Sequence, residues 1–253
     1  MTLANVRNAL ASGRLAVSFL TIVPVRARST RSEEIGSAAA WFPLVGAAVG
    51  AVAGGVRAGV APLVGPGPAT VVALIVGIVL TGGLHQDGLA DAADGLGARG
   101  GLARGLEVMR DSATGAFGVL ALIAWAFLVV TTVAQLSSGQ AVVALTVAAA
   151  VGRLAAVGHA LACRPARSDG LSAAFRPTPA AGAVAAVTGI GLSLGLAGPL
   201  GGAAALGAGA LVCLGSVVIA RRRFGGRTGD TLGATVCLTE AVVCLTLLGV
   251  WHG

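Results

Sequence analysis

Residues 115–136 read GAFGVLALIAWAFLVVTTVAQL and carry no charge over 22 positions. A helix needs about 20 mostly apolar residues to cross the hydrocarbon core of a bilayer. Six further stretches are also mostly apolar: 37–60, 69–84, 141–162, 179–198, 201–220 and 232–251. The sequence therefore predicts an all-α, polytopic transmembrane bundle of about seven spans, forming a single domain over residues 1–253.

The composition supports a membrane protein and argues against other classes. Of the 253 residues, 56% are hydrophobic and 11% are charged, whereas soluble domains carry about 25% charged residues. The formal net charge of +7 would suit a nucleic-acid-binding protein, but no basic stripe is interleaved with aromatic residues. The four cysteines form no CxxC pair, so we interpret them as structural thiols rather than disulfides or zinc ligands.

The basic residues, all arginines, predict the orientation in the membrane. Fifteen of the 17 fall in four segments: 1–36, 85–114, 163–178 and 221–231. With seven spans these segments share one side, and arginine-rich loops stay in the cytoplasm. We therefore expect a multi-pass protein of the cytoplasmic (inner) membrane, with its N-terminus inside and its C-terminus outside.

The N-terminal apolar run LAVSFLTIVPV (15–25) resembles part of a signal peptide. It contains Pro24 and is followed by Arg26, Arg28 and Arg31 instead of a small-residue cleavage site. We interpret it as a retained interfacial or re-entrant segment.

The stretch TGGLHQDGLADAADGLGAR (81–99) places three carboxylates in apolar surroundings. On a helix Asp87, Asp91 and Asp94 are spaced i, i+4, i+7 and share one stripe. Like charges on one stripe repel, so such a stripe favours a bound cation. Gly82 and Gly83 could break the helix before His85, which would decide whether that side chain enters the site.

Glu107 and Asp111 form a second i, i+4 acidic pair. Oxygen ligands without a cysteine cluster favour Mg²⁺ or Mn²⁺ over zinc, and magnesium leaves positions for substrate phosphates. This layout is typical of phosphoryl transfer. Every acidic residue except Glu240 falls on the arginine-rich side, so we expect the active site at the cytoplasmic face. The competing interpretation is a solvated acidic loop balanced by neighbouring arginines.

The string DAADGLGAR (91–99) fits D-x-x-D-G-x-x-A-R, the first part of the signature of CDP-alcohol phosphotransferases. The match is partial, because that signature ends G-x3-D-x3-D. Here Ala103 replaces the glycine and Glu107 the first aspartate, whereas Asp111 fits the second. The resemblance supports displacement of a nucleoside monophosphate from a diphosphate without identifying a substrate.

A closer resemblance covers nearly the whole chain. Its blocks are FLTIVPV (19–25), WFPLVGAAVG (41–50), GGLHQDGLADAADGL (82–96), MRDSATGAFGVLAL (109–122), GR (152–153) and GGRTGDTLGA (225–234). In this order they resemble the cobalamin synthase family, whose members are adenosylcobinamide-GDP ribazoletransferases. The resemblance implies a membrane enzyme of cobalamin biosynthesis that needs Mg²⁺. It would join adenosylcobinamide-GDP to α-ribazole or its 5′-phosphate and release GMP.

These resemblances imply roles for individual residues. By analogy with the alcohol phosphotransferases, the predicted metal ligands are Asp87, Asp91, Asp94 and Glu107. Asp111 is the candidate base, and His85 is a candidate catalytic residue that could equally be structural. Predicted substrate contacts are Arg99, Arg110, Ser112, Arg153, Thr228 and Asp230.

Several points stay open from sequence alone. The loop at 228–231 could simply cap the last helix through Asp230 or Thr231. Arg153 and Glu240 each fall inside an apolar run, where an unpaired charge is costly, and we expect them to be satisfied within the bundle, one option being each other. Competing functions are a phospholipid-making alcohol phosphotransferase and a membrane ion or solute transporter. The oligomeric state is open, a homo-oligomer included.

Overall fold

The computed structural model describes residues 3–25, 27, 32–168 and 170–253. Arg26, Arg28 and Arg31, which the topology prediction uses, lie outside these residues. Within the described ranges the chain is helical, without strands, and has one isolated bridge between Pro165 and Arg227. The elements are α1 (Leu3–Leu20), α2 (Ser32–Ser37), the 3-10 helix η1 (Ala38–Trp41), α3 (Phe42–Val64), α4 (Pro66–Leu80), α5 (Leu84–Gly97), α6 (Gly101–Val108), α7 (Ala116–Val133), α8 (Ser138–Ala162), α9 (Gly170–Ala174), α10 (Pro179–Phe224) and α11 (Gly229–His252).

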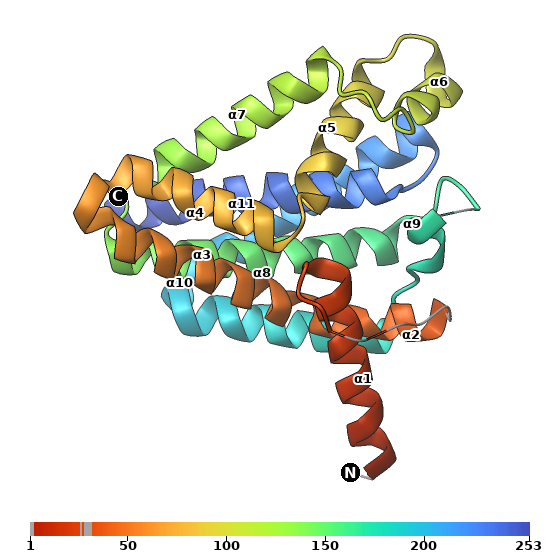
Figure 1. Cartoon of the computed structure of the whole chain (residues 1–253). Coiled ribbons are helices and arrows are strands. Elements are labelled where there is room, and N and C mark those ends of the chain that lie inside the picture. Colours follow the sequence, from red (N-terminus) through yellow and green to blue (C-terminus); the bar gives the residue numbers. More distant parts are fainter. Residues whose placement is uncertain (1–2, 26, 28–31, 169) are drawn as a thin grey trace.

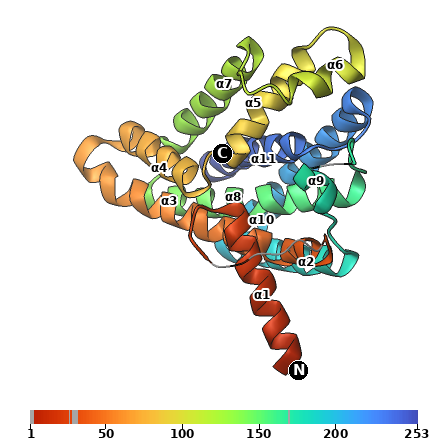
Figure 2. The ribbon, with the colours of Figure 1, turned by 45° about the vertical axis from the view of Figure 1, so that its right-hand side comes forward.

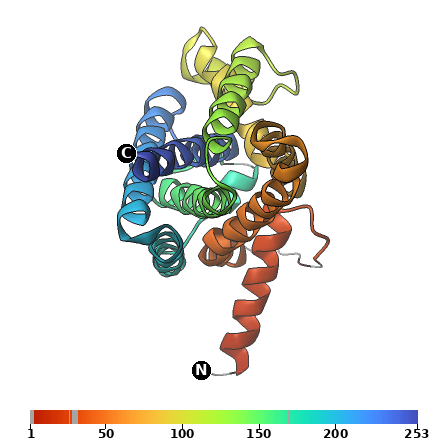
Figure 3. The same ribbon diagram turned by 90° about the vertical axis from the view of Figure 1, so that its left-hand side faces the viewer.

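Helix α8 lies at the centre of the bundle, packed against α3, α10 and α11 (Figure 3). Three glycines at i, i+4, i+8 on α3, Gly46, Gly50 and Gly54, face α8. A Cβ at each would come within 2.4, 2.2 and 2.7 Å of α8 backbone atoms. Side chains larger than hydrogen would force the helices apart, so the small residues permit the close packing that membrane helices use.

The apolar runs predicted from sequence correspond to helices. Five described helices or helix combinations are long and apolar enough to cross a membrane: Glu34–Val64, Ala116–Val133, Ser138–Ala162, Pro179–Phe224 and Gly229–His252. A sixth is counted if α4 and α5, which meet at a bend of 92°, form one broken span. The all-helical multi-pass fold is thus confirmed, whereas the count of seven stays a prediction.

The 46 residues of α10 do not form one straight helix. Gly198 has a non-helical backbone (φ 75°, ψ 172°) and is followed by Pro199. The chain turns back there and packs against itself: a Cβ on Gly202 would lie 2.6 Å from the carbonyl oxygen of Ser193. A straight helix of this length would extend about 70 Å, more than twice the hydrocarbon thickness. The same Gly-Pro solution joins α3 to α4, where Gly65 has φ 86° and ψ 165°.

Helix α1 runs crosswise to α3, α8 and α11 (Figures 1 and 2). It is attached to the bundle by stacked aromatic rings: Phe19 lies 5.7 Å from Phe42 and 6.0 Å from Phe175 between centroids, and Phe42 lies 5.2 Å from Phe175. This orientation agrees with an interfacial N-terminal segment.

Arg57 is a buried charge inside α3 that the sequence did not explain. Its guanidinium donates hydrogen bonds to the carbonyl oxygens of Val133 (3.3 Å) and Leu136 (2.7 Å) and to the hydroxyl of Ser138 (3.3 Å). The Val133 carbonyl ends α7, and the Leu136 carbonyl lies in the turn that follows it. Arg57 therefore supports the turn between α7 and α8.

Candidate active site

The chain breaks between α4 and α5 at two glycines. Gly82 and Gly83 have φ values of 62° and 72°, in the left-handed region that favours glycine. Helix α5 therefore starts afresh at Leu84 and runs at 92° to α4. The structure confirms the break that the sequence offered as the route for His85 into the site.

Helices α5 and α11 then cross in close contact. A Cβ on Gly88 would lie 2.9 Å from the carbonyl oxygen of Asp230, and one on Gly233 would lie 3.2 Å from the carbonyl oxygen of His85. Only glycine allows backbones to approach this closely. The crossing brings the α5 aspartates against the first turn of α11.

The start of α11 is fixed by a capping box. Thr231 donates its backbone amide to the Thr228 hydroxyl at 3.1 Å, and Thr228 donates its own to the Thr231 hydroxyl at 2.9 Å. The N-cap is therefore Thr228 and not Asp230 or Thr231, which were the capping alternatives from sequence, because the helix begins one turn earlier than the apolar run. Asp230 is left in the first turn, where its charge suits the helix dipole and its carboxylate lies near Asp87 and Asp91 of α5.

Three carboxylates gather at this crossing: Asp87, Asp91 and Asp230. Helix α5 lies outside the five long apolar spans, and Asp91 is partly buried there. Burial, followed by the charges of neighbouring aspartates on α5 and α11, raises the pKa of Asp91 to about 6. No group of three or more His, Cys, Asp or Glu side chains among the described residues converges closely enough to hold an ion. Metal binding at this site stays a prediction.

Asp94, the third aspartate of the stripe, contacts the start of α7. Its two carboxylate oxygens accept hydrogen bonds from the backbone amides of Gly115 (2.7 Å) and Gly118 (2.9 Å), and the residue is only 8% exposed. These amides belong to the first turn, where a helix lacks internal partners for its N–H groups. Asp94 therefore caps α7 from a distance, and its role as a metal ligand stays a prediction.

The second acidic pair lies apart from the crossing. Glu107, at the end of α6, is exposed and forms an ion pair with Arg104 at 2.9 Å. Asp111 follows in the exposed α6–α7 loop and accepts a hydrogen bond from the amide of Ala113 at 3.1 Å. The structure does not join these two to the aspartates of α5 as a metal-binding group. The other candidates on this side, Arg99, Arg110 and Ser112, are exposed on the segments flanking α6.

A cavity of about 130 Å³ lies beside the crossing. His85 lines it together with Asp87, Arg153 and Asp230. The stacked rings of Phe19, Phe42 and Phe175 form an apolar wall. The structure thus places four of the predicted site residues around one cavity, His85 among them.

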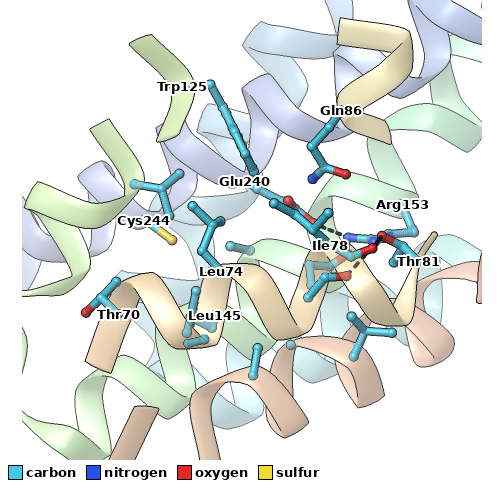
Figure 4. Close-up of a pocket in the computed structure, with 18 residues that line it drawn as sticks. Thr70, Leu74, Ile78, Thr81, Gln86, Trp125, Leu145, Arg153, Glu240 and Cys244 are labelled. Carbon is cyan, nitrogen blue, oxygen red and sulfur yellow. Dashed lines mark hydrogen bonds and ion pairs between the residues drawn. The ribbon is translucent and has the colours of Figure 1, made fainter. Parts of the chain in front are cut away.

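Arg153 and Glu240 form the ion pair that the sequence offered as one option (Figure 4). Arg153 comes from α8 and is 3% exposed; Glu240 comes from α11. The pair also borders a second, smaller cavity of about 60 Å³ within the bundle, lined mostly by apolar side chains with Gln86 and Thr81 at its polar end (Figure 4). Each charge is thereby compensated inside the protein.

Arg227 is a structural residue that sequence reasoning used only for topology. It is buried and donates hydrogen bonds to the carbonyl oxygens of Cys163 (2.9 Å), Ser172 (2.6 Å) and Phe175 (2.6 Å). These bonds hold the segment between α8 and α10 against the N-terminus of α11, because Arg227 directly precedes Thr228. The position of Arg227 within the family block GGRTGDTLGA was the sequence feature that could have indicated its importance.

Comparison with known proteins identifies the family of the chain. A family model described as cobalamin-5-phosphate synthase matches residues 12–248. The chain belongs to this family. Similar proteins include an adenosylcobinamide-GDP ribazoletransferase from Bradyrhizobium diazoefficiens. It is 37% identical over 246 residues, which cover 95% of this chain and 94% of the relative. A protein of the same name from Desulforamulus reducens is 37% identical over 93% of this chain and 96% of its own. No solved structure gives a significant match.

Proposed function

We propose that this protein joins adenosylcobinamide-GDP to α-ribazole or α-ribazole 5′-phosphate and releases GMP, as a transferase of cobalamin biosynthesis. The observation that carries the proposal is family membership over nearly the whole chain, with relatives that bear this enzyme name. The carboxylates held together at the α5–α11 crossing supply the polar chemistry that such a transfer needs.

Magnesium is the metal we expect at this crossing. Asp87, Asp91 and Asp230 offer hard oxygen ligands, and the pKa of Asp91 is raised by burial and then by the neighbouring aspartates, whose repulsion a cation would relieve. Asp94 and Glu107 remain further proposed ligands. When bound, Mg²⁺ would offset negative charge on the diphosphate.

The chain's own residues would orient the acceptor and receive its proton. A ribose hydroxyl of the acceptor would attack the phosphorus nearest cobinamide, with GMP as the leaving group. Two residues are candidates to accept the hydroxyl proton. His85 lies in the cavity with Asp87 and Asp230, whereas Asp111 lies on the exposed loop. Replacing the residue that accepts the proton would lower kcat, whichever of the two it is.

We further propose seven spans, counting α3, α4, α7, α8, the two segments of α10, and α11. Figure 1 supports a polar face: α6 and α9, in the arginine-rich segments, lie at one end of the bundle, and the C-terminus lies at the other. By the positive-inside rule this polar end is cytoplasmic. A reporter fused at Gly253 should read as outside the cytoplasm, and an inside signal would require an even number of spans.

The activity is tested with folded protein in detergent, given adenosylcobinamide-GDP, α-ribazole 5′-phosphate and Mg²⁺. We expect equimolar GMP and a joined corrinoid product by mass spectrometry. Absence of both from a demonstrably folded sample would overturn the proposed function.

A further inference from the structure

A large basic cleft lies next to the carboxylate site. Its volume is about 740 Å³, and it opens between the end of α8, the segment after it, and the end of α10. Five arginines line it: Arg164, Arg167, Arg176, Arg221 and Arg227. None of the described lining residues is acidic, so the cleft carries a concentrated positive charge.

The fold builds this cleft by pinning one loop against the start of α11. Ala166 donates its amide to the carbonyl of Arg227, and Arg227 donates its amide to the carbonyl of Arg164, both at 2.8 Å. The approach requires glycine, because a Cβ on Gly226 would lie 2.5 Å from the carbonyl oxygen of Arg164. The loop that bears Arg164 and Arg167 is therefore held only a few residues from Asp230.

Arg167 joins the cleft to the acidic site. Its guanidinium hydrogen-bonds the carbonyl oxygen of Leu106, the neighbour of Glu107, and it lies close enough to Asp230 for the two opposite charges to attract each other. A ligand could consequently reach from the carboxylates into the cleft without leaving the protein surface.

The arginines divide into structural and available ones. All three nitrogens of the buried Arg227 guanidinium bond to backbone or serine oxygens, and Arg221 donates to the carbonyl that ends α8. Arg176 uses only its Nε, toward Ala173 at 3.0 Å, and is exposed. Arg164 is exposed too, and its side chain has no hydrogen bond to any described residue. These two therefore have guanidinium donors to offer, in the geometry that matches a phosphate.

We propose that Arg164 and Arg176 in this cleft bind the 5′-phosphate of the acceptor α-ribazole 5′-phosphate. The inference rests on the proposed function, which it deepens. A phosphomonoester carries about −1.5 to −2 charges at pH 7 and would be repelled by the carboxylates. The reacting diphosphate belongs with the carboxylates and their cation, so the adjacent basic cleft suits the phosphate that does not react.

The test is calorimetric binding of α-ribazole 5′-phosphate and of α-ribazole to the folded protein, without donor. The wild type should bind the phosphorylated compound more tightly. Arg164→Gln and Arg176→Gln should each raise its Kd about tenfold and change the Kd of α-ribazole less than twofold, and Arg164→Lys should recover part of the loss. Arg222→Gln is the matched control, because Arg222 is exposed on α10 beside Arg221 but does not line the cleft; its Kd values should be those of the wild type.

Several results would overturn the proposal: equal affinity of the wild type for both compounds, or equal losses for both compounds in the cleft variants. An anionic lipid headgroup is the other source of phosphate. Nanodiscs with and without phosphatidylglycerol distinguish it: if the cleft variants alter only the response to this lipid, the cleft is a headgroup site and the proposal is wrong. Because calorimetry needs no turnover, absence of GMP release would contradict the proposed function while the binding data still decide the cleft.

Discussion

Two groups of charged side chains lie close together in this protein and differ in their balance. Arg153 and Glu240 form an ion pair between α8 and α11. Asp87, Asp91 and Asp230 gather between α5 and α11, and none of the three forms an ion pair with another described residue; burial and neighbouring carboxylates raise the pKa of Asp91 to about 6. Both groups use α11, so the same helix carries a neutralised pair and an excess of negative charge.

The difference separates structure from function. A charge that the chain itself compensates serves the packing of the bundle, and replacing both partners by apolar residues costs little. An uncompensated group of carboxylates destabilises the fold unless something from outside the chain binds there. We therefore attribute the ligand chemistry to the α5–α11 crossing and the integrity of the bundle to the pair.

The balanced pair is broken most sharply by Arg153→Met. We expect a loss of up to about 3–5 kcal/mol in the free energy of unfolding, because Glu240, which is mostly buried at 19% exposure, is left without its cation. Denaturant unfolding in detergent measures this loss. The double variant Arg153→Met with Glu240→Leu should recover most of the stability, and a double variant as unstable as the single one would show that the pair is not self-compensating.

The unbalanced group is tested by Asp91→Asn. We expect transfer activity to fall about 10²–10³-fold, the size of effect seen when one electrostatic contact to a reacting group is removed. The melting temperature should stay the same or rise, since one repulsive charge disappears. GMP release and thermal unfolding of the same sample measure the two quantities. Near-normal activity would remove Asp91 from the site, and a large fall in stability would make it a structural residue.

The geometry of the crossing is tested by Gly88→Ala. The new Cβ would lie 2.9 Å from the Asp230 carbonyl oxygen and 3.0 Å from its Cα, so α5 must move away from α11. Because small misplacements of reacting groups are costly, we expect activity to fall about tenfold. Gly249→Ala is the control on α11, where a Cβ meets no atom within 4 Å, and it should leave activity unchanged. Equal activities of the two variants would contradict the close crossing.

Asp94 gives the smallest expected effect. Asp94→Asn removes one of the two acceptors for the amides of Gly115 and Gly118, and loss of such a cap costs about 1 kcal/mol. We expect this loss of stability, measured by thermal unfolding, and the Mg²⁺ dependence of GMP release tests the proposed second role of Asp94. A tenfold increase in the Mg²⁺ concentration needed for half-maximal activity would support Asp94 as a metal ligand, and an unchanged dependence would limit it to capping α7.

The helices could be predicted well from the sequence because a long apolar run in a membrane satisfies its backbone hydrogen bonds most simply as a helix. The run 141–162 became α8 (Ser138–Ala162), and 232–251 became α11 (Gly229–His252). Both helices begin three residues early because of capping boxes at Ser137 and Thr228, which hydropathy does not report. The pairing of Arg153 with Glu240 could be predicted as one option, because each is a single charged residue within an apolar run of the sequence.

The partner of the aspartate stripe could not be found from spacing. Glu107 and Asp111 follow it closely in sequence, but the structure brings Asp230 there instead, about 140 positions further along the chain. That contact depends on the crossing at Gly88 and Gly233, and glycines in an apolar chain do not show which helices they allow to meet. The basic cleft also depends on tertiary contacts, because Arg164 and Arg227 come from separate segments.

The most direct test of the carboxylate site is a Mn²⁺ titration of the folded protein, with Mn²⁺ standing in for Mg²⁺ and free ion quantified by electron paramagnetic resonance. We predict saturable binding by the wild type and an affinity at least about tenfold weaker in Asp91→Asn. Equal binding by both proteins, or none by either, would contradict the claim that the uncompensated carboxylates are held for a metal.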